Sequence, residues 1–193
     1  MGDSYTIGEQ VPLAESFPYQ TVQLLRKRDV EIAAPEIIAK TGWTTGELLS
    51  AVSETKFLRK YNFVSLLIGV NNQYRGRNVE EYKVEFEYLL NQSIELAGNN
   101  PGHVFVLSIP DWGITPFADG KDKNVIAGEI DSFNEACKII TENNGCIFIE
   151  NTTSHRKDHD TEMLAGDGLH PSGKEYAKWS EKLSAFIFAA HSL

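Results

Sequence analysis

Apolar residues along the chain follow two patterns, short continuous runs and longer stretches with helical spacing. The short runs are rich in β-branched residues, are bounded by turn residues and predict strands buried on both faces. They lie at 30–34, 63–68, 103–109 and 146–149. In the stretches between them, apolar residues recur at steps of three and four, which gives each predicted helix one apolar stripe. These helices cover about 17–28, 79–97, 126–140 and 176–186.

Strands that alternate with helices favour right-handed crossovers and a parallel sheet with helices on both faces. We therefore expect an α/β fold, a three-layer α/β/α sandwich with a mostly parallel, flavodoxin-like sheet of about five strands. No linker, repeat or low-complexity tract interrupts the 193 residues, so residues 1–193 are expected to form a single domain. In such sheets ligands bind beyond the carboxyl ends of the strands, which directs attention to the residues that follow each strand.

Composition narrows the classes of function. The formal net charge of −9 at pH 7 argues against a nucleic-acid partner, because phosphate recognition depends on a basic face. No apolar stretch reaches the roughly 18 residues of a membrane span. Cys137 and Cys146 lack the spacing of a zinc site, and their pattern leaves open whether they are bridged. We expect a soluble protein, cytoplasmic or exported after removal of an upstream signal; its oligomeric state leaves no readable pattern.

Two short motifs at opposite ends of the chain carry candidate residues for a nucleophilic site. The sequence GDS at 2–4 places Ser4 among small and polar residues, a combination that is also common in turns. The sequence DGLH at 167–170 places Asp167 three residues before His170, so that in a turn the carboxylate binds one imidazole nitrogen and leaves the other free. A general base for a serine nucleophile needs this arrangement. A loop histidine that only caps or packs is the alternative interpretation.

Residues near two other predicted element ends are candidate donors for a developing oxyanion. Asn71, in GVNN at 69–72, directly follows the strand at 63–68. One amide donor of this kind is worth roughly 2.7–4 kcal/mol of transition-state stabilisation. Gly42 lies just before a helix start that the capping-box spacing of Thr44 and Glu47 predicts, and its backbone N–H is a second candidate. A turn, which Asn and Gly also favour, is the alternative.

In combination these segments resemble the four sequence blocks of the SGNH hydrolases, also called the GDSL esterase/lipase superfamily. The blocks are spread over nearly the whole chain, as GDS at 2–4, Gly42, GVN at 69–71 and DGLH at 167–170. The resemblance implies that Ser4 attacks an acyl carbonyl and that His170 and Asp167 complete a catalytic triad. It also implies an oxyanion hole made of the Ser4 N–H, the Gly42 N–H and the Asn71 side chain.

The activity implied by the resemblance is hydrolysis of carboxylic esters through an acyl-enzyme at Ser4, with no cofactor. Small acyl esters or lysophospholipids come first as substrates, and acetylated carbohydrate is a further class. The alternative is a non-catalytic ligand-binding module on the same fold. In the family a strand leads into the nucleophile turn, whereas here only Met1 precedes Gly2. We expect either that this strand is missing or truncated in the sequence, or that Met1 belongs to its end.

Three aromatic residues and one polar cluster complete the candidates. Tyr74 follows Asn71, and Trp112 and Phe117 follow the strand at 103–109. Their rings are expected either to form an acyl or alcohol pocket at the crevice or to seal their loops onto the core. A metal could in principle bind the imidazole and carboxylate groups of a polar cluster, His155, Asp158, His159 and Asp160. A solvated loop is the favoured interpretation of this cluster, and no metal is expected.

Overall fold

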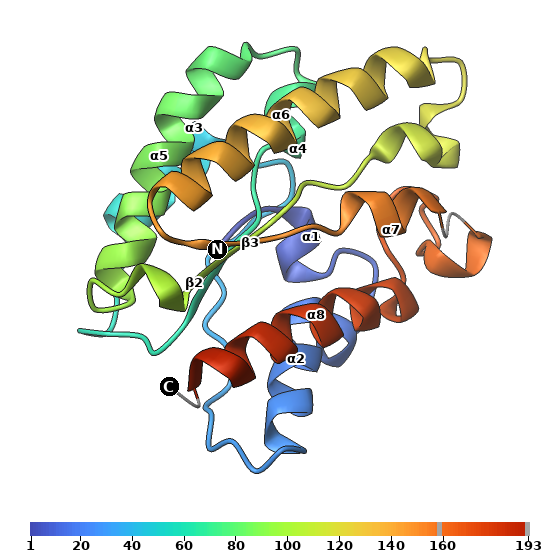
Figure 1. Ribbon diagram of the computed structural model, residues 1–193. Helices are drawn as coiled ribbons and strands as arrows, with labels where there is room; N and C mark the ends of the chain where they lie inside the picture. The colour runs from blue at the N-terminus through green and yellow to red at the C-terminus, as the bar shows by residue number, and fades with distance from the viewer. Residues whose placement is uncertain (158–159, 192–193) are drawn as a thin grey trace.

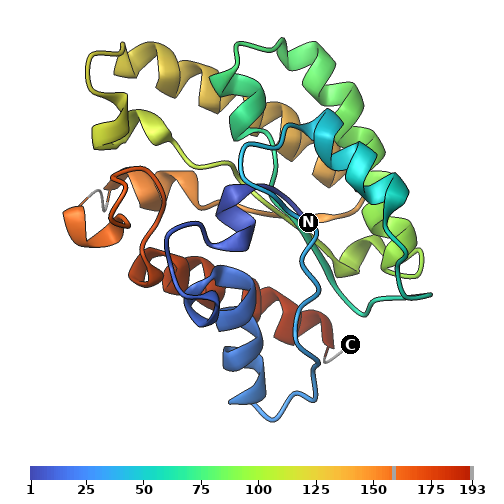
Figure 2. The same cartoon turned by 180° about the vertical axis from the view of Figure 1, so that it is seen from behind.

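The computed structural model describes residues 1–157 and 160–191, with helices on both faces of a small parallel sheet (Figures 1 and 2). In the described residues the strands are β1 (Val64–Leu66), β2 (Val104–Leu107) and β3 (Ile147–Ile149), in that order across the sheet. Each lies within a predicted strand, and both pairings are parallel. Every residue of β2 is buried, because helices cover both faces of the central strand.

Two single-residue bridges extend the sheet beyond β1. Gly2 forms parallel bridges to Leu67 on one side and to Ala39 on the other. The Gly2 amide donates to the Ile38 carbonyl at 3.0 Å, and the Leu67 amide donates to the Met1 carbonyl at 3.1 Å. The α/β fold with a parallel sheet is therefore confirmed, and the expected sheet of about five strands is present as three strands flanked by these bridged segments.

The predicted strand at 30–34 is wrong, because this segment pairs with no strand in the described structure. The Arg26 guanidinium donates two hydrogen bonds to the Ile32 carbonyl. The Ile32 carbonyl is therefore satisfied without a neighbouring strand. Pro35 follows and has no N–H to offer to a ladder. An apolar, β-branched run becomes a strand only where a neighbour pairs with its backbone, and here pairing begins at Ala39.

Helices form the two outer layers of the sandwich. On one face α2 (Phe17–Arg26) packs against α8 (Gly173–His191), and on the other α3 (Thr45–Glu54) and α6 (Lys123–Asn143) both pack against α5 (Val79–Leu96), as Figure 1 shows. α2, α5, α6 and α8 correspond to the predicted helices; α6 and α8 extend beyond the predicted ends, whereas α2 and α5 stop two residues and one residue short of theirs. Shorter elements connect the layers: α1 (Ser4–Ile7), α4 (Val70–Tyr74), α7 (Thr152–Lys157) and the 3₁₀ turns Leu13–Glu15, Pro101–His103, Trp112–Ile114, Pro116–Ala118 and Thr161–Met163. The three-layer arrangement follows the predicted alternation of strands and helices.

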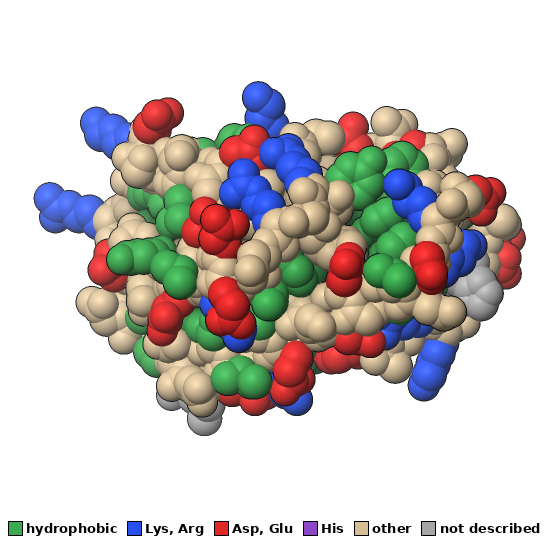
Figure 3. Space-filling model, turned by 90° about the horizontal axis from the view of Figure 1, so that it is seen from above, with side chains coloured by type: hydrophobic (Ala, Val, Ile, Leu, Met, Phe, Trp, Pro, Cys, Tyr) green, Lys and Arg blue, Asp and Glu red, His purple; other side chains and the backbone are tan. Residues whose placement is uncertain are grey.

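The surface carries mixed charge. Figure 3 shows acidic and basic side chains interspersed over the upper face, with no single basic patch on the face in view. In the described part of the chain, no helix is both long and apolar enough to cross a membrane.

The two cysteines are free and buried. Burial raises the pKa of the Cys137 thiol to about 12 and that of Cys146 to about 11. Both side chains are therefore protonated, inert members of the core, and the question of a bridge left open by the sequence is answered in favour of free thiols.

Candidate active site

Ser4 begins the short helix α1, directly after the segment that is bridged into the sheet. Asp3 caps this helix, because its Oδ1 accepts a hydrogen bond from the Tyr5 amide at 3.0 Å. Gly8 ends the helix in the left-handed region, with φ of 75°. Ser4 itself is 4% exposed, and it lines the cavity described next.

A cavity of about 140 Å³ lies beside Ser4. It is lined by residues that come from well-separated parts of the sequence. The predicted site residues among them are Ser4, Gly42, Asn71, Tyr74, Trp112, Phe117 and His170. Asp167 does not line the cavity; it contacts His170 from outside. The fold therefore brings every predicted site residue to one place.

The loop before α8 holds Asp167 and His170 together. Asp167 Oδ2 lies 2.6 Å from His170 Nδ1, and Oδ1 accepts the backbone amides of Leu169 and His170, both at 3.0 Å. Burial acts to raise the pKa of Asp167, but the hydrogen bonds from the His170 side chain and from these amides outweigh it and hold the pKa below its usual value. The ionised carboxylate fixes the tautomer with the proton on Nδ1, which leaves Nε2 available as a base.

His170 and Ser4 face the same cavity without a hydrogen bond between their side chains in the described structure. The imidazole packs against the ring of Tyr5, with the ring centroids 5.1 Å apart. His170 is 6% exposed, so its environment is set by these neighbours. Catalytic hydrogen bonds are often long in a substrate-free enzyme and tighten when substrate binds.

Asn71 and Gly42 present polar groups to the cavity. Asn71 Nδ2 donates to the Trp43 carbonyl at 3.0 Å and to Asp3 Oδ2 at 3.3 Å. Gly42 has a φ of 81°, a left-handed conformation that glycine adopts at little cost. To donate to an oxyanion, the Asn71 amide has to release the longer of its two hydrogen bonds, the one to Asp3.

Asp3 is a buried carboxyl group beneath the cavity. Its exposed fraction is 0%. Burial raises its pKa to about 7, against the opposing influence of the hydrogen bonds from the Tyr5 amide and the Asn71 side chain. From the sequence, Asp3 was expected only to help form a turn, and its place in the GDS motif was the available signal.

Tyr74, Trp112 and Phe117 form an aromatic cluster at the mouth of the cavity. The ring centroids are 5.2 Å apart for Tyr74 and Trp112, 6.0 Å for Tyr74 and Phe117, and 5.9 Å for Trp112 and Phe117. Trp112 is 5% exposed, and its Nε1 donates to Gln73 Oε1 at 2.7 Å. Tyr74 and Phe117 are 49% and 44% exposed. Trp112 therefore anchors the cluster, whereas the other two rings face solvent at the rim.

Other cavity residues escaped the sequence analysis. They are Tyr5, Thr41, Val70 and Leu169. Each is the sequence neighbour of a predicted site residue, and this adjacency was the only signal that could have found them.

The polar cluster at 155–160 differs from its predicted form. Asp158 and His159 lie outside the described residues. The expectation of a solvated loop is wrong for His155, which is 2% exposed and has its Nδ1 3.5 Å from Glu175 Oε1. Within the described ranges, no group of three or more His, Cys, Asp or Glu residues is arranged to hold a metal ion.

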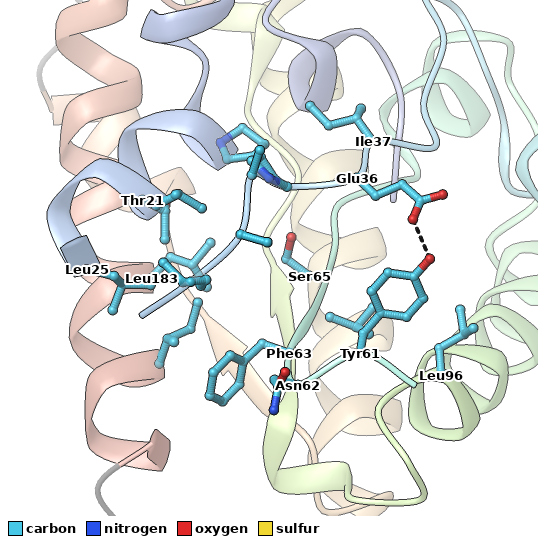
Figure 4. Close-up of a pocket in the computed structure, with 18 of the residues that line it drawn as sticks. Thr21, Leu25, Glu36, Ile37, Tyr61, Asn62, Phe63, Ser65, Leu96 and Leu183 are labelled. Carbon is cyan, nitrogen blue, oxygen red and sulfur yellow. Dashed lines mark hydrogen bonds between the residues drawn. The ribbon is translucent and has the colours of Figure 1, made fainter. Parts of the chain in front are cut away.

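A larger hollow of about 400 Å³ lies elsewhere, between α2, α8 and the segments 30–38 and 57–65 (Figure 4). Leu25, Phe63 and Leu183 are typical of its mainly aliphatic and aromatic lining, and none of the predicted site residues reaches it. The hydrogen bond drawn there joins the Tyr61 hydroxyl to the Glu36 carboxylate. We assign the candidate site to the smaller cavity, because there a hydroxyl, an imidazole and amide donors converge.

Solved structures with a similar fold include several hydrolases. The acetylxylan esterase Axe2 from Geobacillus stearothermophilus aligns over 96% of this chain and 91% of its own, with 18% identity and a TM-score of 0.76. A lipase/acylhydrolase from Enterococcus faecalis aligns over 98% and 93%, with 18% identity and a TM-score of 0.74. The psychrotrophic esterase EstA from Pseudoalteromonas sp. aligns over 100% and 97%, with 14% identity and a TM-score of 0.71. At these identities the likeness establishes a shared fold.

Sequence comparison identifies the family. No curated protein sequence matches the chain. The sequence profile of the GDSL-like lipase/acylhydrolase family, by contrast, matches residues 1–178. This match spans most of the chain and includes all the residues gathered at the smaller cavity. The chain therefore belongs to the GDSL-like lipase/acylhydrolase family.

Proposed function

We propose that this protein is a serine esterase that hydrolyses small carboxylic esters through an acyl-enzyme at Ser4. One observation carries the proposal, namely that a single cavity is lined by four site residues from separate segments, Ser4, Gly42, Asn71 and His170. In addition, Asp167 Oδ2 lies 2.6 Å from His170 Nδ1. A nucleophile, a base, a residue that orients the base and donors for the oxyanion are the parts that acyl transfer needs.

Acylation begins when Ser4 Oγ attacks the ester carbonyl and its proton passes to His170 Nε2. The carbonyl electron pair moves onto the oxygen, which accepts hydrogen bonds from the Ser4 and Gly42 amides and the Asn71 side chain. Asp167 stabilises the imidazolium that forms. The tetrahedral intermediate then collapses, the bond to the alcohol oxygen breaks, and the imidazolium returns its proton to the departing alcohol.

Deacylation repeats these steps with water. His170 Nε2 takes a proton from a water molecule as the water oxygen attacks the acyl carbon, and the same donors hold the oxyanion. Collapse breaks the bond to Ser4 Oγ, which regains a proton from the imidazolium. The acid is released and the enzyme returns to its starting state.

The size of the cavity favours short acyl groups. At about 140 Å³ it is smaller than the roughly 300–1,000 Å³ of sites that enclose drug-sized ligands. A long acyl chain, such as that of a lysophospholipid, would extend beyond it. Small acyl esters are therefore our first substrate class. Acetylated carbohydrate is the second, since Axe2 is an acetylxylan esterase.

The test is release of p-nitrophenol from acetate, butyrate and octanoate esters near neutral pH. Ser4→Ala and His170→Ala should each lose roughly 10³-fold or more in kcat, and acetate should be the best substrate. Ser65→Ala is the matched control, because Ser65 lines the larger hollow, and it should keep full activity. A folded wild-type protein that is inactive on every ester would overturn the proposal in favour of a non-catalytic binding module.

A further inference from the structure

Arg75 links two parts of the candidate site that are far apart in sequence. It follows α4 directly and caps that helix, which carries Asn71. Its side chain reaches the turn that contains Gly42, where Nη2 donates to the Gly42 carbonyl at 2.5 Å. One residue is thus attached through its backbone to the helix of one proposed oxyanion donor and through its side chain to the turn of the other.

A second contact fixes the direction of the Arg75 guanidinium. Its Nη1 lies 3.2 Å from Glu47 Oε2 and 3.4 Å from Glu47 Oε1. Glu47 is itself held, because its carboxylate accepts the Thr44 amide at 2.8 Å in the capping box that begins α3. The guanidinium therefore bridges the Gly42 turn and the first turn of α3, and its planar fork suits two acceptors at once.

The turn at Gly42 has few other restraints. The Trp43 amide donates to the Lys40 carbonyl at 3.2 Å, Asn71 donates to the Trp43 carbonyl, and the Thr41 hydroxyl donates to the Glu9 carboxylate. None of these bonds acts on the Gly42 carbonyl. Gly42 has no side chain of its own to pack, and without a Cβ its backbone can leave the φ of 81° for other conformations at little cost. The Gly42 carbonyl and the Gly42 N–H belong to adjacent peptide planes that meet at the Gly42 Cα. A donor that fixes the carbonyl plane therefore also anchors the Cα from which the plane of the N–H begins, and so limits how far the turn can shift.

We propose that Arg75 is a positioning residue that clamps the Gly42 turn and thereby holds the Gly42 N–H in place for the oxyanion. The inference rests on the proposed function, which supplies the oxyanion. Arg75 does not touch the reacting atoms in this arrangement. The ion pair between Arg75 and Glu47 contributes little to stability by itself, because both side chains are 43% exposed. We therefore expect the charged hydrogen bond from Arg75 to the Gly42 carbonyl to contribute most of the restraint on the turn.

The experiment compares Arg75→Ala and Arg75→Lys with Arg77→Ala. Arg77 is exposed, and its side chain has no recorded partner among the described residues, so it is a matched control for loss of an arginine in the same loop. Amide hydrogen exchange at 41–43 measures the clamp without reference to catalysis. We expect exchange there to be about tenfold faster or more in Arg75→Ala and unchanged in Arg77→Ala, with Arg75→Lys between them.

Steady-state kinetics on p-nitrophenyl acetate measure the consequence for chemistry. Arg75→Ala should lower kcat about tenfold or more and leave KM within about twofold, because a donor that matters only in the transition state affects kcat alone. Millimolar guanidinium should restore part of the lost activity of Arg75→Ala and have no such effect on Arg77→Ala. Rescue of this kind is not expected from a residue that only stabilises the fold.

The outcomes separate this inference from the proposed function. Unchanged exchange at 41–43 in Arg75→Ala overturns the clamp, whatever the kinetics show. If amide exchange at 41–43 is faster in Arg75→Ala but kcat is unchanged, Arg75 holds the turn without contributing to catalysis, and the catalytic part of the inference is overturned. In both cases Ser4→Ala still loses activity and the esterase proposal stands. A wild-type protein that is inactive on all esters overturns the proposed function and with it the catalytic part of this inference, while the exchange data still decide whether Arg75 holds the turn.

Discussion

The two hollows described above differ in size and in chemistry: the larger is mainly apolar, and the smaller gathers polar groups. The larger, of about 400 Å³, lies along α2 and α8 and has a mainly aliphatic and aromatic lining that includes Leu25 and Leu183. The smaller, of about 140 Å³, brings together the hydroxyl of Ser4, the imidazole of His170 and the amide of Asn71. A search guided by volume alone would choose the larger one.

The position of each hollow relative to the sheet explains the difference. The residues that follow β1 and β2 lead directly to the smaller cavity, because parallel strands end at the same edge and deliver the next residues there. The larger hollow instead borders the segment 30–37, which pairs with no strand in the described structure, and no carboxyl ends of strands meet there. Convergence of polar groups from several segments, and not volume, is the ground on which we propose the smaller cavity as the catalytic site.

The largest effect is expected from Asp167→Asn, which tests whether the smaller cavity is the site of the chemistry. The variant keeps the shape of the side chain but removes the charge that fixes the His170 tautomer, so kcat should fall by about 10²- to 10⁴-fold. Asp29→Asn is the control, since Asp29 is exposed and asparagine also tolerates its φ of 59°; its kcat should not change. Wild-type kcat in Asp167→Asn would mean that Asp167 does not orient the base.

A substitution in the lining of the larger hollow should lower the stability of the protein and leave kcat unchanged. Leu25 is 0% exposed and lines this hollow, so Leu25→Ala should lower the free energy of unfolding by about 2–5 kcal/mol. Leu13, which is 54% exposed, is the control, and Leu13→Ala should change stability by no more than about 0.5 kcal/mol. Urea denaturation measures both. A lower kcat in folded Leu25→Ala would show that the larger hollow does affect the chemistry, which would break the comparison.

A pH effect is expected from Asp3, beneath the smaller cavity. Its pKa is raised to about 7 in the fold, so its contribution to stability is complete below the ordinary aspartate pKa of about 3.9 and is lost as the pH rises towards 7. Across this window, one proton changes the free energy of unfolding by at most about 1.4 kcal/mol per pH unit. Asp3→Asn, which cannot titrate, should flatten this decline in urea denaturation between about pH 4 and pH 7.

Asp29→Asn again provides the control for Asp3, because the carboxyl group it removes is exposed. It should leave the pH dependence of stability as it is in the wild type. If Asp3→Asn shows the same decline as the wild type, the buried carboxyl does not titrate in this window. The hydrogen bonds from Tyr5 and Asn71 would then hold it ionised despite its burial.

Much of the fold could be predicted because the apolar runs at 63–68, 103–109 and 146–149 each became a strand with helices on both sides. The run at 30–34 has a similar composition and did not, since its backbone found no neighbour to pair with. Conversely, Gly2 and Ala39 joined the sheet without an apolar run to predict it. Pairing depends on the partner segment as much as on the residues that pair, and this dependence limits a prediction from local pattern.

Those residues of the candidate site that lie in local sequence motifs could be predicted. Ser4 and His170 lie in recognisable local sequences, and the fold brought them to one cavity. The contact of Arg75 with Gly42 crosses 33 residues, and no local pattern announces it. His155 was expected in solvent for the same reason: the Glu175 carboxylate that lies near it comes from α8, and only the tertiary structure brings α8 to that loop.

The smallest expected effect tests whether the aromatic rim limits the size of the smaller cavity. Tyr74 and Phe117 face solvent at its mouth, and truncating either to alanine removes a wall while Trp112 stays anchored to Gln73. The ratio of kcat/KM for octanoate to that for acetate should therefore rise several-fold in Tyr74→Ala and Phe117→Ala. The change should arise mainly in KM, because the rings do not touch the reacting atoms.

Tyr88→Ala is the control for the rim, since Tyr88 is 63% exposed on α5 and does not line the cavity. Its chain-length profile should match the wild type. If the profiles of Tyr74→Ala and Phe117→Ala also match it, the rings only seal their loops onto the core, and the boundary of the acyl site is set deeper, by residues such as Val70 and Leu169. The small hollow would then owe its selectivity to the same convergence of segments that supplies its chemistry.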